Sequence, residues 1–263
     1  MNDNVDPTGA VAGWWATAVS RMEPGVIELR GHPVQELIGT TSLTSMIWLM
    51  LRGELPCPRR TRLLEAALVA SVDHGPQAPS IAIARMAATC GIGLNNAVAS
   101  AVNALGDSHG GAGEQCVCLL TEILEAEGAG IDLETAVEQV IATWPHYLPG
   151  YGHRFHPVDP RRDPLLSLVD EAVRDGVVAG DHLRAARAVE AALNRGRATP
   201  VPMNIDGATA VIYAELGFPA PLARGMFVIS RSIGILAHAW EETQQGRRNK
   251  GPIPRSILPA HLT

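Results

Sequence analysis

Three side chains that can move or hold a proton stand beside glycines in this sequence of 263 residues. His109 lies in the stretch SHGGAGE, His153 in PGYGHRFHPVDPRR and Asp206 in NIDG. Glycine lets the backbone adopt unusual angles and approach a ligand closely. Imidazole and carboxylate groups are the usual general acids and bases of enzymes. The three residues are therefore candidates for proton transfer at one site.

Each motif also has a plain structural interpretation. The SHGGAGE stretch could be a glycine turn with a surface histidine, although a helix N-terminus there could also bind an anion. The stretch around His153 could be a proline-rich connection, and Asp206 could be a helix N-cap. His153 and His156 are spaced i, i+3, but no third ligand is near, so we expect no metal site.

Cationic and imidazole side chains accompany these motifs. Asp159-Pro160-Arg161 forms a turn-like motif that could aim the arginine, and Arg231 interrupts an apolar segment in ISRSIG. His74 ends another apolar segment. An arginine fork binds a carboxylate through two hydrogen bonds. Together with two histidines and one carboxylate, these groups suit aldol or Claisen chemistry on a polycarboxylate.

The elements that would position these residues are nearly all helical. Aromatic residues make up only 4% of the chain, while alanine and leucine are abundant, which favours helices. Apolar periodicity and helix start and stop signals predict about ten helices. They are expected over 42–53, 58–75, 79–90, 94–106, 113–128, 132–144, 164–175, 181–196, 205–216 and 222–246.

Three further expectations complete the predicted architecture. Residues 26–30 could form one short strand, and residues 1–12 look disordered. In the last helix, one stripe should be buried, because its apolar residues recur at helical spacing; the stripe consists of Ile229, Ile233, Leu236, Ala237 and Trp240. The fold class is all-α with almost no sheet.

Bulk composition narrows the function classes. The net charge of −6 argues against a general nucleic-acid binder. The four cysteines lack metal-ligand spacing and read as free buried thiols, which suit a reducing cytoplasm. No run of 18 apolar residues and no basic, apolar N-terminal leader is present, so we expect a soluble cytoplasmic protein without a membrane partner.

Five motifs, in this order, resemble the citrate synthase superfamily. They are SVDHG around His74, SHGGAGE, GYGHRFHPVDPR, NIDG and ISRSIG. The resemblance covers roughly residues 26–263. Within the superfamily the chain is most similar to the free-standing citryl-CoA lyases and to the lyase domain of ATP citrate lyase. That similarity rests on three stretches: NIDGATAV, GDSHGGA and the ending SILPAHL.

The resemblance implies a two-domain helical fold, shortened at the N-terminus, and a homodimer. A large domain of residues 1–109 and 213–263 would form the dimer core, and a small domain of residues 110–212 would close over the substrate. A citryl-CoA synthetase is a possible partner. CoA would arrive as part of the substrate, with no bound cofactor and no metal.

The resemblance also implies roles for the residues named above. In the cleavage of citryl-CoA to acetyl-CoA and oxaloacetate, His153 would take the hydroxyl proton, His109 would stabilise the enol of acetyl-CoA and Asp206 would return a proton to its methyl carbon. The substrate carboxylates would be held by His74, Arg161 and Arg231. CoA would meet the loop of Pro149, Gly150, Tyr151 and Gly152.

The chain departs from the family pattern at three places. His156 and Pro157 stand where synthases usually have a basic residue that can meet a CoA phosphate. Gly113 stands where Asn is common. The arginine that synthases place on the partner subunit's substrate has three candidates here, Arg247, Arg248 and Arg255. Two other functions remain open: condensation of an acyl-CoA with oxaloacetate or another 2-oxo acid, and non-catalytic binding of CoA esters or citrate. A binder should have lost His109, His153 or Asp206, and all three are present.

Overall fold

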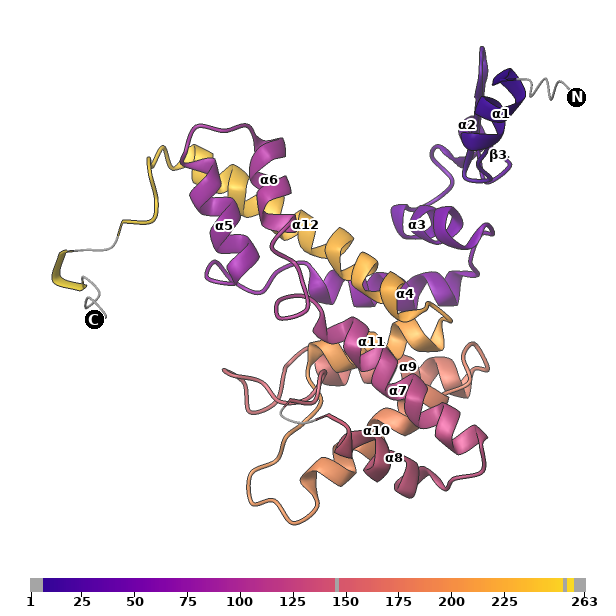
Figure 1. The fold of residues 1–263 in the computed structure, drawn as a ribbon, viewed down its shortest axis with the longest axis vertical. Helices are drawn as coiled ribbons and strands as arrows, with labels where there is room; N and C mark the ends of the chain where they lie inside the picture. Colours follow the sequence, from indigo (N-terminus) through magenta and orange to yellow (C-terminus); the bar gives the residue numbers. More distant parts are fainter. Residues whose placement is uncertain (1–6, 145–146, 253–254, 258–263) are drawn as a thin grey trace, which may run out of the picture. The chain divides into compact units, whose positions relative to one another are not determined.

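The computed structural model describes residues 7–144, 147–252 and 255–257 (Figure 1). The chain divides into two compact units, Met1–Arg62 and Leu63–Thr263. This boundary lies within the larger of the two domains expected from the family resemblance. The division into residues 1–109 with 213–263 and residues 110–212 stays a prediction.

The first unit contains short helices and a small sheet. Its helices are α1 (Pro7–Trp14), α2 (Val34–Leu37), α3 (Leu43–Arg52) and the start of α4 (Pro58–Ser71). The sheet is antiparallel in the order β1 (Ser20–Glu23), β2 (Val26–Leu29), β3 (His32–Pro33). One strand was expected here. Gly25 and Gly31 take positive φ angles of 78° and 81°, which turn the chain twice and add the two flanking strands.

The expectation of disorder over residues 1–12 differs from the structure. Residues 1–6 lie outside the described residues, but Pro7–Trp14 forms α1. Proline is favourable at the first position of a helix because its fixed φ matches the helix and its missing N–H is not needed there.

The second unit is helical throughout its described elements. It contains α5 (Pro79–Ala88), α6 (Leu94–Val102), α7 (Ala112–Gly128), α8 (Leu133–Ala142), α9 (Arg162–Arg174), α10 (Asp181–Asn194), α11 (Ile205–Glu215), α12 (Ala220–Gln244) and the 3-10 turn η1 (Arg255–Ile257). All ten predicted helices are present, with ends that differ by a few residues. The all-α fold class is confirmed.

Helix α11 lies at the centre of the second unit, where it packs against α7, α9, α10 and α12. Its residues are buried on every side from Gly207 to Ala214. A helix that is apolar all round is buried all round. The helix is therefore a fixed support for the residue at its N-terminus, Asp206.

The predicted buried stripe of α12 is wrong. Its four large side chains are between 42% and 54% exposed, namely Ile229, Ile233, Leu236 and Trp240. The side of the helix that carries Arg231, Ile235 and Ala239 is buried instead. Periodicity identifies an apolar face but does not say what covers it, and α12 has apolar residues on two faces.

Two smaller expectations can also be compared with the structure. The four cysteines are free, but Cys57 and Cys90 are exposed rather than buried. Among the described residues, α12 is long and apolar enough to cross a membrane by length and composition alone, as core helices of soluble proteins can be. Here it packs against α5, α6 and α7.

Candidate active site

A cavity of about 810 Å³ in the second unit collects most of the residues singled out from the sequence. It is formed by the loops before α7, α9 and α11, by α12 and by the segment after α4. The predicted residues that line it are His74, His109, Tyr151, Gly152, His153, Asp206 and Arg231. Arg161 lies one layer behind, in contact with His74.

Asp206 faces this cavity from the first turn of α11. The N-cap of that helix is Asn204, whose side-chain oxygen accepts hydrogen bonds from the amides of Asp206 and Gly207 at 2.9 and 3.2 Å. The cap role that the sequence allowed for Asp206 is thus filled by its neighbour. Burial raises the pKa of the Asp206 carboxyl, and the charges of Arg161 and Arg231 offset this only in part. A carboxyl with a raised pKa can act as a proton donor or acceptor near neutral pH.

His109 is held from behind by the first turn of α5. The backbone N–H of Ser80 donates to His109 Nε2 at 3.1 Å, and Ser80 Oγ lies 2.9 Å from the same nitrogen. Because Nε2 accepts this backbone hydrogen bond, the ring proton belongs on Nδ1. Burial, aided by the charge of Arg231, lowers the pKa of His109. The ring is therefore a neutral donor, which suits it to hold an enolate oxygen.

We expect activity to decline as the pH falls below 6.5, the ordinary pKa of histidine. The lowered pKa keeps His109 neutral down to that range, and protonation at Nε2 would abolish the acceptor for the Ser80 amide. A pH profile of kcat should place the acid limb below 6.5. An acid limb above pH 7 would contradict this assignment of the protonation state.

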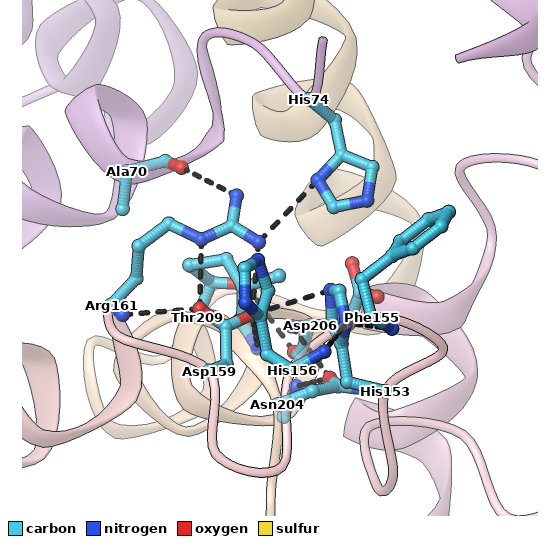
Figure 2. A network of polar contacts seen from close by, with 12 residues as sticks. Ala70, His74, His153, Phe155, His156, Asp159, Arg161, Asn204, Asp206 and Thr209 are labelled. Carbon is cyan, nitrogen blue, oxygen red and sulfur yellow. Dashed lines mark hydrogen bonds and ion pairs between the residues drawn. The ribbon is translucent and has the colours of Figure 1, made fainter. Parts of the chain in front are cut away.

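His153 lies in the loop before α9 (Figure 2). Its Nδ1 accepts hydrogen bonds from the amides of Phe155 and His156, both at 3.1 Å. The proton therefore belongs on Nε2, which lies 3.9 Å from a carboxylate oxygen of Asp159. The His74 ring stands edge-on at 5.5 Å between centroids. Burial lowers the pKa of His153, although the Asp159 charge opposes this.

Asp159 is a site residue that the sequence interpretation mentioned only as part of a turn. It is buried and forms two parallel hydrogen bonds with Arg161, each 2.9 Å long, and it accepts the amide of Ile205 at 3.2 Å (Figure 2). Burial raises its pKa, but the hydrogen bonds and charge of Arg161 outweigh this and bring the value to about 2. Asp159 thus ties the loop of His153 to the start of the helix that carries Asp206.

The two predicted carboxylate-binding arginines differ in their surroundings. Arg161 already has its guanidinium bonded to Asp159, and it reaches the Ala70 carbonyl at 3.3 Å and His74 Nδ1 at 3.5 Å. Arg231 is buried on α12, donates to the Ser71 carbonyl at 3.1 Å and stacks over Phe227 at 4.7 Å. Among the described residues no carboxylate lies within ion-pair distance of Arg231. Arg231 is therefore the better placed of the two for a substrate carboxylate.

The predicted CoA-binding loop has a structural reason for its first glycine. Gly150 has φ 86°, and a side chain there would lie 2.7 Å from Cys116 Sγ and 2.8 Å from Gly207 Cα. The glycine thus permits close packing on α11 rather than contact with a ligand. Tyr151 and Gly152 line the cavity, whereas Pro149 and Gly150 do not.

The remaining predicted residues lie away from this cavity or outside the described part. Arg247 and Arg248 are exposed after α12 and do not line it. The side chain of Arg255 and residues 258–263, which include most of the SILPAHL ending, are outside the described residues. Within the described ranges, no group of three His, Cys, Asp or Glu side chains could hold a metal ion.

Sequence reasoning missed Ser80, Asn204 and the full role of Asp159. Asn204 could have been found, because Asn is a favoured N-cap residue and stands directly before the predicted helix 205–216. Ser80 carries no such signal, because its backbone amide donates the hydrogen bond to His109 and every residue except proline has such an amide.

Comparison with known proteins shows the family to which the chain belongs. Residues 56–256 match the family model described as "Citrate synthase, C-terminal domain". The chain belongs to the citrate synthase family. Among its relatives in that family is the citrate synthase of Acidithiobacillus ferridurans, 29% identical over 200 residues. That match covers 73% of this chain and 49% of the relative, so the chain spans about half the length of the citrate synthase it matches.

Solved structures within the citrate synthase fold extend the comparison. Citryl-CoA lyase from Hydrogenobacter thermophilus has a TM-score of 0.82 at 33% identity, covering 95% of this chain and 94% of that one. ATP citrate lyase from Methanothrix soehngenii, in complex with citrate and coenzyme A, has a TM-score of 0.81 at 19% identity. This chain is covered completely there but matches 45% of that protein, a likeness of fold. The chain thus shares its fold with enzymes that are named for citryl-CoA and citrate.

Proposed function

We propose that this protein is a citryl-CoA lyase that releases acetyl-CoA and oxaloacetate. The observation that carries the proposal is the match to the Hydrogenobacter citryl-CoA lyase, which covers nearly the whole of both chains at 33% identity. The match to a citrate synthase reaches only about half of that relative. We further propose that the enzyme is soluble and cytoplasmic and takes CoA only as part of its substrate.

The reaction needs one proton to leave an oxygen and one to reach a carbon. His153 Nε2 receives the proton of the tertiary hydroxyl, the oxygen forms a carbonyl, and the carbon–carbon bond breaks. The electron pair passes into the thioester to give an enolate, which accepts a hydrogen bond from His109 Nδ1–H. Asp206, whose pKa is raised by burial, then gives a proton to the enol carbon.

The resting structure adds a condition to the first of these steps. His153 Nδ1 accepts two amides, so Nε2 carries the proton before substrate binds. To accept a hydroxyl proton at Nε2, the ring must move its own proton to Nδ1. The amides of Phe155 and His156 must then turn away, so we propose that this loop rearranges when citryl-CoA binds.

The second candidate is a condensing enzyme that joins an acyl-CoA to oxaloacetate or another 2-oxo acid. It is favoured by the sequence relatives, which are named as citrate synthases. The same groups would act in reverse, with Asp206 as the base. A third candidate, a non-catalytic binder of CoA esters or citrate, does not explain why a neutral histidine donor and a carboxyl with a raised pKa share one cavity.

Mass spectrometry of two reactions separates these candidates. One tube receives citryl-CoA and the other receives acetyl-CoA with oxaloacetate. Rapid release of acetyl-CoA and oxaloacetate in the first tube is the expected result. An inactive first tube with citrate or citryl-CoA formed in the second would favour the condensing enzyme. Inactivity in both tubes, with binding of CoA esters retained, would favour the binder.

We also propose that the protein is a homodimer in which the exposed stripe of α12 is covered by a second copy. Four large apolar side chains on one helix are about half exposed, and contiguous patches of this kind usually mark an interface. Trp240→Lys should therefore give a particle with the mass of one chain in size-exclusion chromatography with light scattering. Ala191→Lys adds the same charge to an exposed position of α10 and should leave the dimer intact. A wild-type monomer would contradict the proposal.

A further inference from the structure

The loop that carries His109 is closed on itself. The amide of Gly106 donates to the His109 carbonyl at 2.9 Å, and the amide of His109 donates back to the Gly106 carbonyl at 3.2 Å. These bonds make a tight turn between α6 and α7. The position of the imidazole therefore depends on what holds this turn against the rest of the unit.

Arg224 of α12 joins the two ends of that turn. Its Nη2 lies 2.5 Å from the Asp107 carboxylate, which precedes His109, and its Nε contacts the carboxylate of Glu114 in the first turn of α7. One guanidinium thus links the segments before and after the histidine. No other described arginine or lysine forms an ion pair with either carboxylate.

The two glycines after His109 let the turn lie close to α12. Gly110 has φ 101°, and a side chain there would come within 2.9 Å of the Phe227 ring. A side chain on Gly111 would come within 2.7 Å of the Asp107 carbonyl and 3.1 Å of Arg224 Nη2. The turn is therefore packed directly against the guanidinium, and a shift of Arg224 would displace it.

We propose that Arg224 is a positioning residue, which fixes His109 between the Ser80 amide and the cavity. This role rests on the proposed function for its catalytic consequence. Arg224 does not line the cavity, so it acts through His109 rather than on the substrate.

The expected effect on catalysis is larger than the effect on folding. The Asp107 side chain is 80% exposed, and ion pairs that water can reach add little to stability. A displacement of about 1 Å in a reacting group can lower a rate by about 100-fold. Loss of Arg224 should thus lower kcat in a protein that remains folded.

Two readouts test this on Arg224→Met. Hydrogen exchange of the substrate-free protein should be at least about tenfold faster at the amides of Gly106 and His109, because local opening sets their protection. With citryl-CoA, kcat should fall by about 10- to 100-fold while KM changes little. Arg224→Lys keeps the positive charge and should restore part of the amide protection and part of kcat.

The matched control is Arg187→Met, which removes an exposed helical arginine that pairs with Asp170 through two hydrogen bonds of 2.9 and 2.6 Å. It should change neither readout. If Arg224→Met behaves like this control, the proposal is wrong; a raised KM with unchanged exchange would also overturn it and indicate direct ligand contact. If the wild type cleaves no CoA ester, the proposed function fails. The exchange data alone then decide whether Arg224 restrains the turn that carries His109. If Arg224→Met does not fold, Arg224→Lys and Glu114→Gln are measured in its place.

Discussion

Replacing Asp206 with Asn should lower kcat by about 10²- to 10⁴-fold and at the same time raise the melting temperature at pH 8. The loss follows because an amide cannot transfer the proton that the enol carbon needs. The gain follows from the surroundings of the carboxyl group, because burial disfavours its charged form and an amide carries no charge. Active-site residues often lower stability in this way.

The sign of the stability change comes from the pKa. The folded-state pKa of Asp206 is raised above its ordinary value of 3.8. The stability it contributes is therefore fully present only below pH 3.8 and is lost as the pH rises through the folded-state pKa. The Asp206→Asn variant has no such loss, so the difference in melting temperature should shrink as the pH is lowered toward 4.

Calorimetry from pH 4 to 8 and single-turnover kinetics measure the two effects. Glu65→Gln, at an exposed position of α4, is the matched control and should leave both nearly unchanged. An Asp206→Asn enzyme that keeps its kcat would remove Asp206 from the mechanism. A fall in melting temperature at pH 8 would show that attraction to Arg161 and Arg231 outweighs burial.

Replacing Gly234 with Ala should destabilise the protein by about 1–3 kcal/mol or more. This glycine lies in α12 where the helix touches the corner after α4, and a methyl group there would stand 2.2 Å from the Val72 carbonyl oxygen. Backbone cannot move aside as a flexible side chain can. The corner carries His74, and its Ser71 carbonyl accepts from Arg231, so substrate binding should weaken as well.

Gly225 provides the control within the same helix. A methyl group there would meet no atom within 4 Å, and Gly→Ala in a helix interior gains up to about 1 kcal/mol. In urea unfolding, Gly234→Ala should thus be less stable than the wild type and Gly225→Ala should be more stable. Equal stability of the two variants would mean that α12 does not approach Val72 as closely as the structure has it.

The helices could be predicted from the sequence because local signals set them. Ser42 caps α3 and Gly53 ends it in the left-handed conformation, as the residue types indicate. Only one strand of the three-stranded sheet was predicted, because the two outer strands are only four and two residues long and are partly exposed. Alternation over so few residues carries little information.

The candidate site could be predicted in its composition but not in its connections. His109, His153, Asp206 and Arg231 do meet at one cavity, and glycines or unexpected polarity marked each of them. The pairing of Asp159 with both Arg161 and the Ile205 amide joins residues 46 positions apart, which no local pattern reveals. The exposed stripe of α12 was misassigned for the same reason, since burial depends on what lies opposite.

The most direct test of the proposed lyase is a single turnover of citryl-CoA in D₂O, followed by mass spectrometry of the products. Cleavage with proton return from Asp206 predicts oxaloacetate and an acetyl-CoA that carries one deuterium in its methyl group, with both formed about 10²- to 10⁴-fold more slowly by Asp206→Asn. Release of citrate and free CoA would instead indicate thioester hydrolysis, and unchanged citryl-CoA would mean that the enzyme does not cleave it. Either result would contradict the proposed function.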